Sequence, residues 1–232
     1  MLIAEELALL LYEDDRGAPS VDSTKLDYAL GGAILVELAM KEPGSEPGSE
    51  RVRITEENEP GVRKGRLVVS PGSNPDDPVL AEAIVLLRTQ QGRKPKEVLG
   101  KLRKLSGGLR TRLLRRLSER GILRYERRKV WRIFPIDRWP TADPAAERTV
   151  RDRLHQCLVV GQQPDARTSA LISILSAIDH AHKALQLTDR GDRRQARDRA
   201  KQIAKGDWTG QAVKKALEEL QAAVIAGSAG GS

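Results

Sequence analysis

The chain of 232 residues has few aromatic side chains and a single cysteine, and each shortage excludes a class of protein. Aromatic residues make up 3% of the sequence, against 39% apolar and 31% charged residues, which favours Leu- and Ala-rich helices over a strand-rich sandwich. The lone Cys157 can form neither an internal disulfide nor a metal cluster, which excludes a disulfide-stabilised secreted framework and predicts a core position. The length suffices for a large core, so the composition predicts a cytosolic, mainly helical protein.

Long hydrophobic runs are also missing. No segment approaches the roughly 20 apolar residues that a membrane-spanning helix needs. The apolar opening, residues 1–11, is interrupted by Glu5 and Glu6 and has no basic region before it, unlike a secretion signal. We therefore expect neither a transmembrane anchor nor an exported form.

The sequence carries none of the motifs that mark common enzymes and metal sites. Walker, dinucleotide-binding and nucleophile-elbow patterns are absent, and the pair Gly31 and Gly32 falls inside a predicted helix, where it cannot cradle phosphate in the usual way. No histidine stands at the spacing that metal sites use, so structural roles are expected for His155, His180 and His182. The sequence therefore predicts no catalytic residue, no metal and no cofactor.

Apolar residues at intervals of three and four predict helices along most of the chain. The predicted helical segments are 2–12, 26–41, 80–88, 98–105, 109–120, 145–157, 169–187, 192–204 and 209–226. The strongly apolar segment 26–41 is predicted to be a buried central helix, with Ser23 or Thr24 as its N-cap. Its two internal glycines cost about 1 kcal/mol each relative to alanine, which predicts the close approach of another backbone.

Two other segments are predicted to be flexible. Residues 42–78 are rich in Pro, Gly, Ser and Glu and should form a loop region, although strand-like pieces at 52–54 and 66–69 predict a small hairpin within it. The last residues, 227–232, read GSAGGS and should form a flexible tail.

The positive charge is concentrated in one part of the chain. Residues 88–138 contain 18 Lys and Arg against 4 Asp and Glu, net +14, so the remaining chain, with 22 against 28, carries net −6. This part holds an arginine-rich helix, 109–120, which Gly121 is placed to cap. A hairpin follows within 124–139, predicted as two strands around the charged turn ERRK at 126–129, with the second arm ending at Pro135.

A basic helix followed by a basic hairpin permits three interpretations. In a winged-helix nucleic-acid-binding protein, helix 109–120 enters the major groove while Arg127, Arg128 and Lys129 at the hairpin tip reach phosphates. In a protein-interaction scaffold, the hairpin forms an oligomer contact. In a peripheral membrane protein, the hairpin sits in the headgroup region of an anionic bilayer.

The apolar content of the hairpin favours the membrane interpretation. Six large apolar residues alternate with its charges, and they include two of the three tryptophans and the only phenylalanine: Val130, Trp131, Ile133, Phe134, Ile136 and Trp139. A membrane-surface loop needs aromatic groups at headgroup level beside lysines and arginines, whereas a nucleic-acid wing has little need of them. Two alternatives stay open, namely that the aromatic side chains pack in the protein's own core and that the charge run is a solvated face.

The same residues resemble a known family over nearly the whole chain. The opening LIAEELALLL, the helix YALGGAILVELAMK, the segment RLLRRLSERGILR with its hairpin, and the helical last third are similar to the Golgi phosphoprotein 3 family, in its actinobacterial branch. The resemblance implies one mainly α domain over residues 1–226, with a central helical bundle wrapped by amphipathic helices and one projecting β-hairpin. Eukaryotic members are peripheral membrane adaptors that recognise phosphatidylinositol 4-phosphate and retain glycosyltransferases, and they are not known as enzymes.

The headgroup pocket of that family is only partly matched. The four family positions are a tryptophan before the central helix, an arginine within that helix and two arginines at the start of the helix before the hairpin. They correspond here to Asp22, Gly31, Gly107 and Arg110, so only the last is retained. Possible substitute cations are Arg112 and Arg103, near Arg110 in the sequence, and Lys25, near the lost tryptophan position. Because headgroup selectivity needs several positioned donors, these residues predict a less selective anionic-lipid surface.

The hairpin corresponds better to the family than the pocket does. In the family this element inserts into the bilayer and can join protomers, and here it holds Val130, Trp131, Ile133 and Phe134. The resemblance therefore implies a cytoplasmic protein on the inner face of a membrane. Its implied partners are the anionic phospholipid surface, the tails of membrane enzymes and a second copy through the hairpin, with nucleic acid as the alternative.

Overall fold

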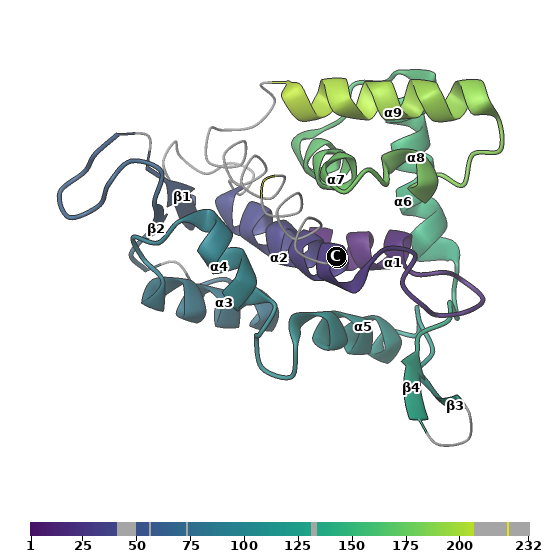
Figure 1. Ribbon diagram of the computed structural model, residues 1–232, viewed down its shortest axis with the longest axis horizontal. Coiled ribbons are helices and arrows are strands. Elements are labelled where there is room, and N and C mark those ends of the chain that lie inside the picture. Colours follow the sequence, from purple (N-terminus) through teal and green to yellow (C-terminus); the bar gives the residue numbers. More distant parts are fainter. Residues whose placement is uncertain (41–49, 56, 73, 131–133, 207–221, 223–232) are drawn as a thin grey trace.

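The computed structural model describes residues 1–40, 50–55, 57–72, 74–130, 134–206 and 222, and within them the chain is mainly helical (Figure 1). The elements in order are α1 (Ile3–Leu11), α2 (Ser23–Ala39), β1 (Val52–Ile54), β2 (Leu67–Val69), α3 (Pro78–Thr89), α4 (Pro95–Leu102), α5 (Leu109–Glu119), β3 (Glu126–Val130), β4 (Phe134–Arg138), α6 (Ala145–His155), the π-helical turn η1 (Gln156–Val160), α7 (Ala166–Ala177), α8 (Ala181–Ala184) and α9 (Arg190–Lys205). The mainly α fold class is confirmed.

The first two helices form the centre of the molecule. In Figure 1, α1 and α2 lie in the middle, with α3, α4 and α5 on one side and α6 to α9 on the other. All nine residues of α1 are buried, which no amphipathic surface helix shows. Helix α7 is likewise buried all round, from Thr168 to Leu175. Helix α5 instead turns one apolar stripe inward: it buries Leu109, Leu113, Leu114 and Leu117 and leaves its arginines outside this core.

The central helix α2 begins earlier than predicted. Its N-cap is Asp22, whose Oδ1 accepts hydrogen bonds from the backbone N–H groups of Thr24 at 2.8 Å and Lys25 at 3.2 Å, so the predicted cap at Ser23 or Thr24 is wrong. A carboxylate is a strong N-cap because it also meets the positive end of the helix dipole. The expected backbone approach at Gly31 is confirmed, since a Cβ there would lie 3.4 Å from the carbonyl oxygen of Leu99 on α4.

The last third of the chain is helical but more broken than predicted. The predicted helix 169–187 is two helices, α7 and α8, separated where Asp179 adopts a positive φ of 53°. Residues 145–157 end as α6 and continue as the turn η1. The predicted helix 209–226 and the tail 227–232 lie outside the described residues, apart from residue 222. In the loop region, β1 and β2 form the predicted small antiparallel hairpin.

The second hairpin, β3 and β4, has a different register from the predicted one. The segment ERRK lies inside β3 and not at the turn, and Pro135 is paired with Lys129 inside β4 instead of ending it. Charged residues are tolerated along β3 because Glu126 lies between Arg124 and Arg128 and pairs with both. Proline is tolerated because every strand of a two-stranded ribbon is an edge strand. The turn between the two strands, 131–133, lies outside the described residues.

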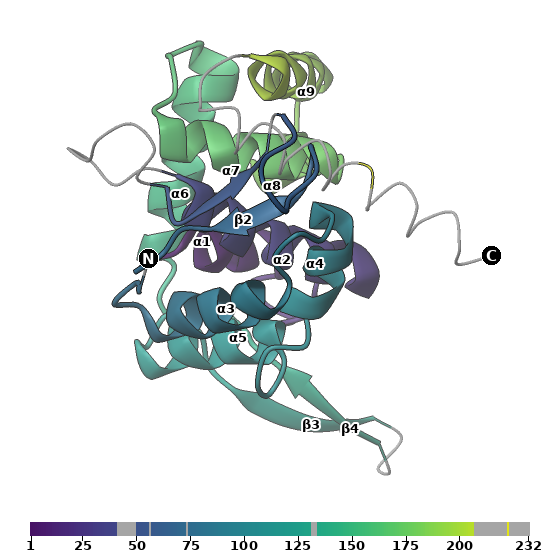
Figure 2. The same cartoon turned by 90° about the vertical axis from the view of Figure 1, so that its left-hand side faces the viewer.

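The base of this hairpin is packed into the body. Trp139 is only 5% exposed, its ring lies 4.8 Å from the ring of Tyr125, and its backbone N–H donates to the carbonyl oxygen of Gly17 at 2.9 Å. Gly17 allows this contact, because a Cβ there would lie 2.3 Å from the backbone of Trp139 and Pro140. Trp139 is therefore a core residue that anchors the hairpin, while β3 and β4 project away from the helices (Figure 2).

Candidate functional site

The candidate cations Arg110 and Arg103 meet at one carboxylate. Arg110 donates from Nε and Nη2 to Oδ1 of Asp27 on α2 at 2.9 and 2.6 Å, and Nε of Arg103 lies 3.9 Å from the other carboxylate oxygen. Burial raises the pKa of the neighbouring Tyr12, while Arg110 acts on that pKa in the opposite direction. Two of the four candidate headgroup residues are thus brought together at Asp27, whose carboxylate already accepts hydrogen bonds from the guanidinium of Arg110.

Arg112 lies on another face of α5. It forms an ion pair with Glu82 of α3 and donates to the carbonyl oxygen of Pro78 at 3.3 Å. Two residues along a helix are separated by about 200° of rotation, so closeness to Arg110 in sequence does not bring the side chains together. Lys25 lies in the first turn of α2, and among the described residues no ion pair joins its side chain to Asp27, the carboxylate that Arg103 and Arg110 share.

Each lost position of the family pocket has a structural role in this chain. Asp22 caps α2, and Gly31 packs against α4. Gly107 has a positive φ of 76° in the turn that leads into α5, a conformation that strongly favours glycine. Of the three positions, Gly107 is the one whose backbone conformation disfavours an arginine.

Two buried glutamates of α1 hold the arginines of three surrounding helices. Glu5 is fully buried and lies 3.2 Å from Nε of Arg116 and 3.5 Å from Nη1 of Arg120, both at the end of α5. Glu6 likewise pairs with Arg153 of α6 at 2.5 Å and with Arg167 of α7 at 3.5 Å. Buried charges need such partners. The sequence reasoning missed these roles and treated the two acids only as interruptions of an apolar run.

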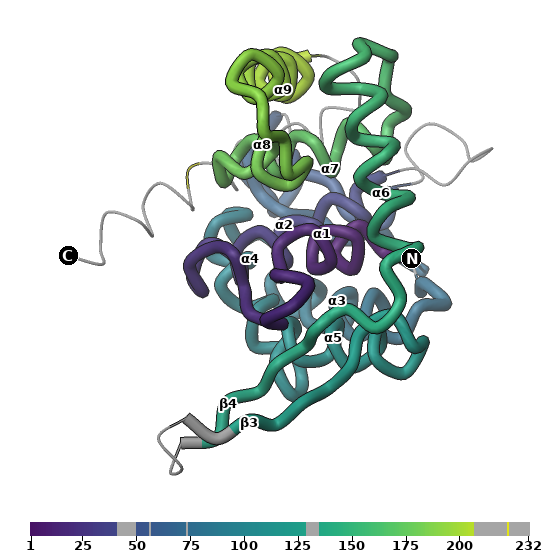
Figure 3. The backbone as a smooth tube through the Cα atoms, turned by 90° about the vertical axis from the view of Figure 1, so that its right-hand side faces the viewer, coloured from purple at the N-terminus to yellow at the C-terminus, as the bar shows by residue number. Residues whose placement is uncertain are grey.

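The hairpin and the residues just before it carry several arginines that are exposed to solvent. Arg124 and Arg128 share Glu126 and are 65% and 63% exposed, and Arg127 is also exposed. On α5, Arg115 is the exposed arginine, and within the described part of the chain neither it nor Arg127 has an ion pair. The hairpin therefore carries a surplus of accessible cations, and Figure 3 shows it extending beyond the helices.

Two of the four predicted inserting residues lie in the described part of the hairpin. Val130 and Phe134 are opposite each other as the last backbone pair of the β3–β4 ladder, away from the anchored base at Trp139. Trp131 and Ile133 lie between these two in the sequence and outside the described residues.

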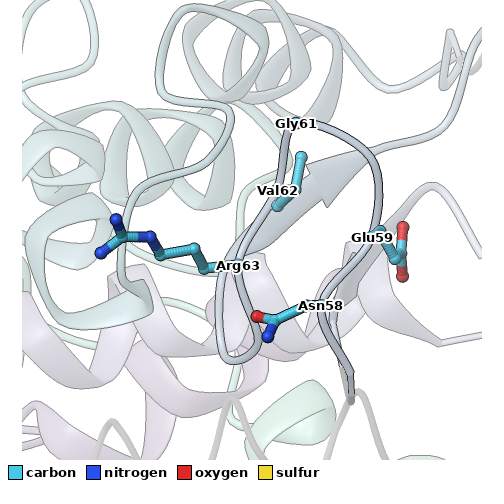
Figure 4. A pocket seen from close by; sticks show the side chains of 5 residues that line it. All are labelled: Asn58, Glu59, Gly61, Val62 and Arg63. Atoms are coloured by element: carbon cyan, nitrogen blue, oxygen red, sulfur yellow. The ribbon is translucent and has the colours of Figure 1, made fainter.

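A hollow in the β1–β2 connection carries no comparable charge cluster. It encloses about 400 Å³ and is lined by Asn58, Glu59, Gly61, Val62 and Arg63 (Figure 4). The carboxylate of Glu59 accepts two hydrogen bonds from Arg53 at 2.5 and 2.6 Å, and Oδ1 of Asn58 accepts from the backbone N–H of Lys64 at 2.9 Å. These bonds shape the loop and leave the acid and the amide oxygen occupied.

The buried His180 has a structural contact. Its Nε2 lies 3.2 Å from Oγ of Ser20, which itself donates to the carbonyl oxygen of Leu11 at 3.0 Å. The serine proton is therefore used, and the imidazole is the donor to Oγ. Burial lowers the pKa of His180 to about 4, so the ring is neutral at physiological pH and fixes the loop that joins α1 to α2.

Comparisons with known proteins agree with this architecture. The family model described as Golgi phosphoprotein 3 (GPP34) matches residues 3–220. Over 177 residues the chain is 25% identical to vacuolar protein sorting-associated protein 74 of Eremothecium gossypii, an alignment that covers 68% of this chain and 49% of that relative. The chain thus spans about half the length of the curated relative. Among the described residues, no helix combines the length and apolarity required to cross a bilayer. A family match over most of the chain shows that this protein belongs to the Golgi phosphoprotein 3 family.

Proposed function

We propose that this chain is a non-catalytic peripheral membrane protein that binds anionic phospholipid through the β3–β4 hairpin and the exposed cations beside it. The observation that carries the proposal is the geometry of the hairpin. Its base is anchored by Trp139, its arms carry exposed arginines, and it projects from the helical body (Figure 2). An apolar end flanked by cations is the combination that an anionic bilayer surface attracts.

Two forces contribute to this binding. Each accessible cation adds roughly 1 kcal/mol near an anionic surface, which Arg127 and Arg128 of β3 and Arg124, just before it, can supply. Apolar side chains at the end of the hairpin add the free energy of leaving water, about 1.5 to 3 kcal/mol for a fully buried large side chain. Trp131 and Phe134 make the largest such contribution in this proposal.

The proposed surface selects for charge more than for one headgroup. A phosphate that approaches Arg110 or Arg103 meets the carboxylate of Asp27, which already bonds the guanidinium of Arg110 at 2.6 Å. Arg112 and Lys25 add cations from other directions and do not complete one ring of donors. Phosphatidylinositol 4-phosphate therefore binds, in this proposal, as one anionic lipid among several.

The family also supports a location and a partner class. We place the protein in the cytoplasm, on the inner face of the membrane, where it acts as an adaptor for the tails of membrane enzymes. The described structure gives a winged-helix role little support, because Arg110, Arg112 and Arg116 of α5 are bonded to carboxylates of this chain. Nucleic acid is retained as a competitor in the binding test.

Binding to phosphatidylserine vesicles should weaken steeply as salt rises. Exposed charges are screened beyond about 10 Å at 0.1 M ionic strength and beyond about 3 Å at 1 M, so attraction by the hairpin arginines fades over this range. Co-sedimentation at increasing salt measures the effect, with circular dichroism at each concentration to confirm that the helices persist. Binding that stays constant across the range would show that the arginines do not drive it.

A further inference from the structure

The chain that leaves the β3–β4 hairpin is bound to the loop between α1 and α2. The backbone N–H of Thr141 donates to the carbonyl oxygen of Asp14 at 3.0 Å, and the hydroxyl of Thr141 donates to Oδ1 of the same aspartate at 3.2 Å. Two residues earlier, the backbone N–H of Trp139 donates to the carbonyl oxygen of Gly17. Asp14 therefore holds the base of the hairpin through both its backbone and its side chain.

A second acid, from α6, meets Asp14 at this point. Glu147 is only 1% exposed, and its carboxyl group lies close enough to that of Asp14 to share a hydrogen bond with it. One cation serves both acids, because Arg151 lies 3.6 Å from Oδ2 of Asp14 and 2.5 Å from Oε1 of Glu147. The Nε of Arg151 is used elsewhere, since it donates to the carbonyl oxygen of Ala184 at 3.1 Å.

Two acids and one cation leave an excess of negative charge when both acids are ionised. Among the described residues, the charged groups that act on Glu147 are Asp14 and Arg151. Thr141, from the hairpin side, and Gln186, just after α8, also reach the pair, and both are uncharged. The other charged side chains of the adjoining loop, α6 and α8 include several that are exposed to water: Asp15, Arg16, Arg148, Asp152 and Lys183. A buried excess charge is relieved when one of the acids keeps its proton.

The surroundings of the two acids assign this proton to Glu147. Burial and the hydrogen bond with Asp14 raise the pKa of Glu147 to about 8. Burial also acts to raise the pKa of Asp14, but the hydrogen bond with Glu147 and the charge of Arg151 lower it below its ordinary value. At neutral pH, Glu147 is therefore protonated and donates to the ionised carboxylate of Asp14.

We propose that Asp14 and Glu147 form a proton-dependent switch at the base of the hairpin. With the proton in place, the two side chains are joined by a hydrogen bond, and α6, the α1–α2 loop and the hairpin are held together. When the proton leaves, two like charges face each other in a buried position, and the loop and the hairpin base separate from α6. This proposal does not require the membrane role.

The switch predicts that stability falls as pH rises. The pKa of Glu147 in the folded chain lies above its ordinary value of 4.5, so the folded chain retains a proton that the unfolded chain has released. The free energy of unfolding therefore decreases between about pH 4.5 and about pH 8, and the effect is complete above that range. Asp14, whose pKa is lowered, acts in the opposite direction, below its ordinary value of 3.8.

The test measures how open the hairpin base is at two pH values. Trp131→Phe and Trp208→Phe leave Trp139 as the only tryptophan of the full chain, and acrylamide then quenches its fluorescence at about pH 6.5 and about pH 9, each at least about one unit from the pKa of Glu147. The quenching constant should rise at least about twofold with pH, because local opening exposes a side chain that is 5% exposed in the closed state. Tyr125, next to Trp139, keeps its proton because a hydrogen bond with Asp137 raises its pKa.

Three further variants in this background separate the switch from a general effect of pH. Glu147→Gln keeps the shape of the side chain and does not titrate, so neither the quenching nor the urea midpoint should change between the two pH values. Glu13→Gln is the matched control, since it removes a partly exposed acid from the same loop, and it should retain both changes. Asp14→Asn removes the like charge and keeps an acceptor for Thr141, so the transition should move to lower pH.

The proposal is overturned if Glu147→Gln keeps the pH-dependent quenching, or if Asp14→Asn has its transition at the same pH as its parent. It is also overturned if the urea midpoint changes with pH through Glu147 while the quenching of Trp139 stays constant. In that case Glu147 holds a proton without controlling the hairpin. All of these measurements are made without lipid, so they are independent of membrane binding.

Discussion

Replacing Trp131 and Phe134 together by serine is expected to weaken binding to anionic vesicles by at least about 100-fold. Burial of a large apolar side chain contributes roughly 1.5 kcal/mol or more, and two such losses correspond to about two factors of ten. Phe134 belongs to the last backbone pair of the ladder, with Val130, and Trp131 is the residue after Val130 in the sequence. Co-sedimentation with phosphatidylserine vesicles measures the loss, and far-ultraviolet circular dichroism should show an unchanged helical signal.

The matched control is the pair Val85→Ser and Val160→Ser. These valines are 60% and 58% exposed, on α3 and η1, so the control removes apolar surface without touching the hairpin. It should bind vesicles as the wild type does. If the hairpin variant also binds unchanged, insertion is excluded. Size-exclusion chromatography of the same variants distinguishes the membrane role from the scaffold interpretation. If the hairpin is an oligomer contact, loss of its aromatic groups lowers the oligomer mass and leaves lipid binding unaffected.

Replacing Glu5 by alanine is expected to lower the free energy of unfolding by about 3 kcal/mol. Removal of one partner from a buried ion pair costs about 3 to 5 kcal/mol because the remaining charge is left without compensation. The lower value applies here, since Arg116 keeps Asp77 and Arg120 is 45% exposed to water. The loss of Glu5 also removes the acceptor of the Leu2 backbone N–H at 2.7 Å. Urea unfolding should show a lower midpoint with an unchanged slope.

Glu13→Ala is the control for this stability prediction. Glu13 pairs with Arg16 on the surface, where the two side chains are 41% and 79% exposed, and such pairs contribute about 0 to 1 kcal/mol. Its midpoint should stay close to that of the wild type. Glu5→Gln, which keeps the shape and loses the charge, should fall between the two. If the unfolding midpoint of Glu5→Ala equals that of the control, the ion pairs of Glu5 with the arginines of α5 do not contribute to stability.

Much of the fold follows from patterns that act over short distances in the sequence. Apolar periodicity predicts α1, α3 and α5 to within a few residues, because each helix buries one stripe or all of its surface. Such patterns fail where the backbone conformation depends on which side chains pair with each other. The register of β3 and β4 is one case, because ion pairs to Glu126 allow charges within a strand that resemble a turn in sequence.

The candidate site is harder to predict because its charges are paired over long distances. Arg110 and Asp27 are 83 residues apart in sequence, and the buried Glu5 meets Arg116 from another helix. A local net charge of +14 over residues 88–138 therefore overstates the positive charge that faces solvent. A sequence signal for the pairing does exist, since two adjacent acids inside the most apolar opening helix require basic partners.

The most direct test of the membrane role is co-sedimentation of the full chain with three sets of vesicles in the presence of excess nucleic acid. The sets are neutral phosphatidylcholine, phosphatidylserine, and phosphatidylinositol 4-phosphate adjusted to the same total charge. We expect the protein to sediment alike with both anionic sets and not with the neutral one, because Asp27 occupies Arg110 while the hairpin cations remain accessible. Failure to sediment with any vesicle, or release by the nucleic acid, would contradict the account.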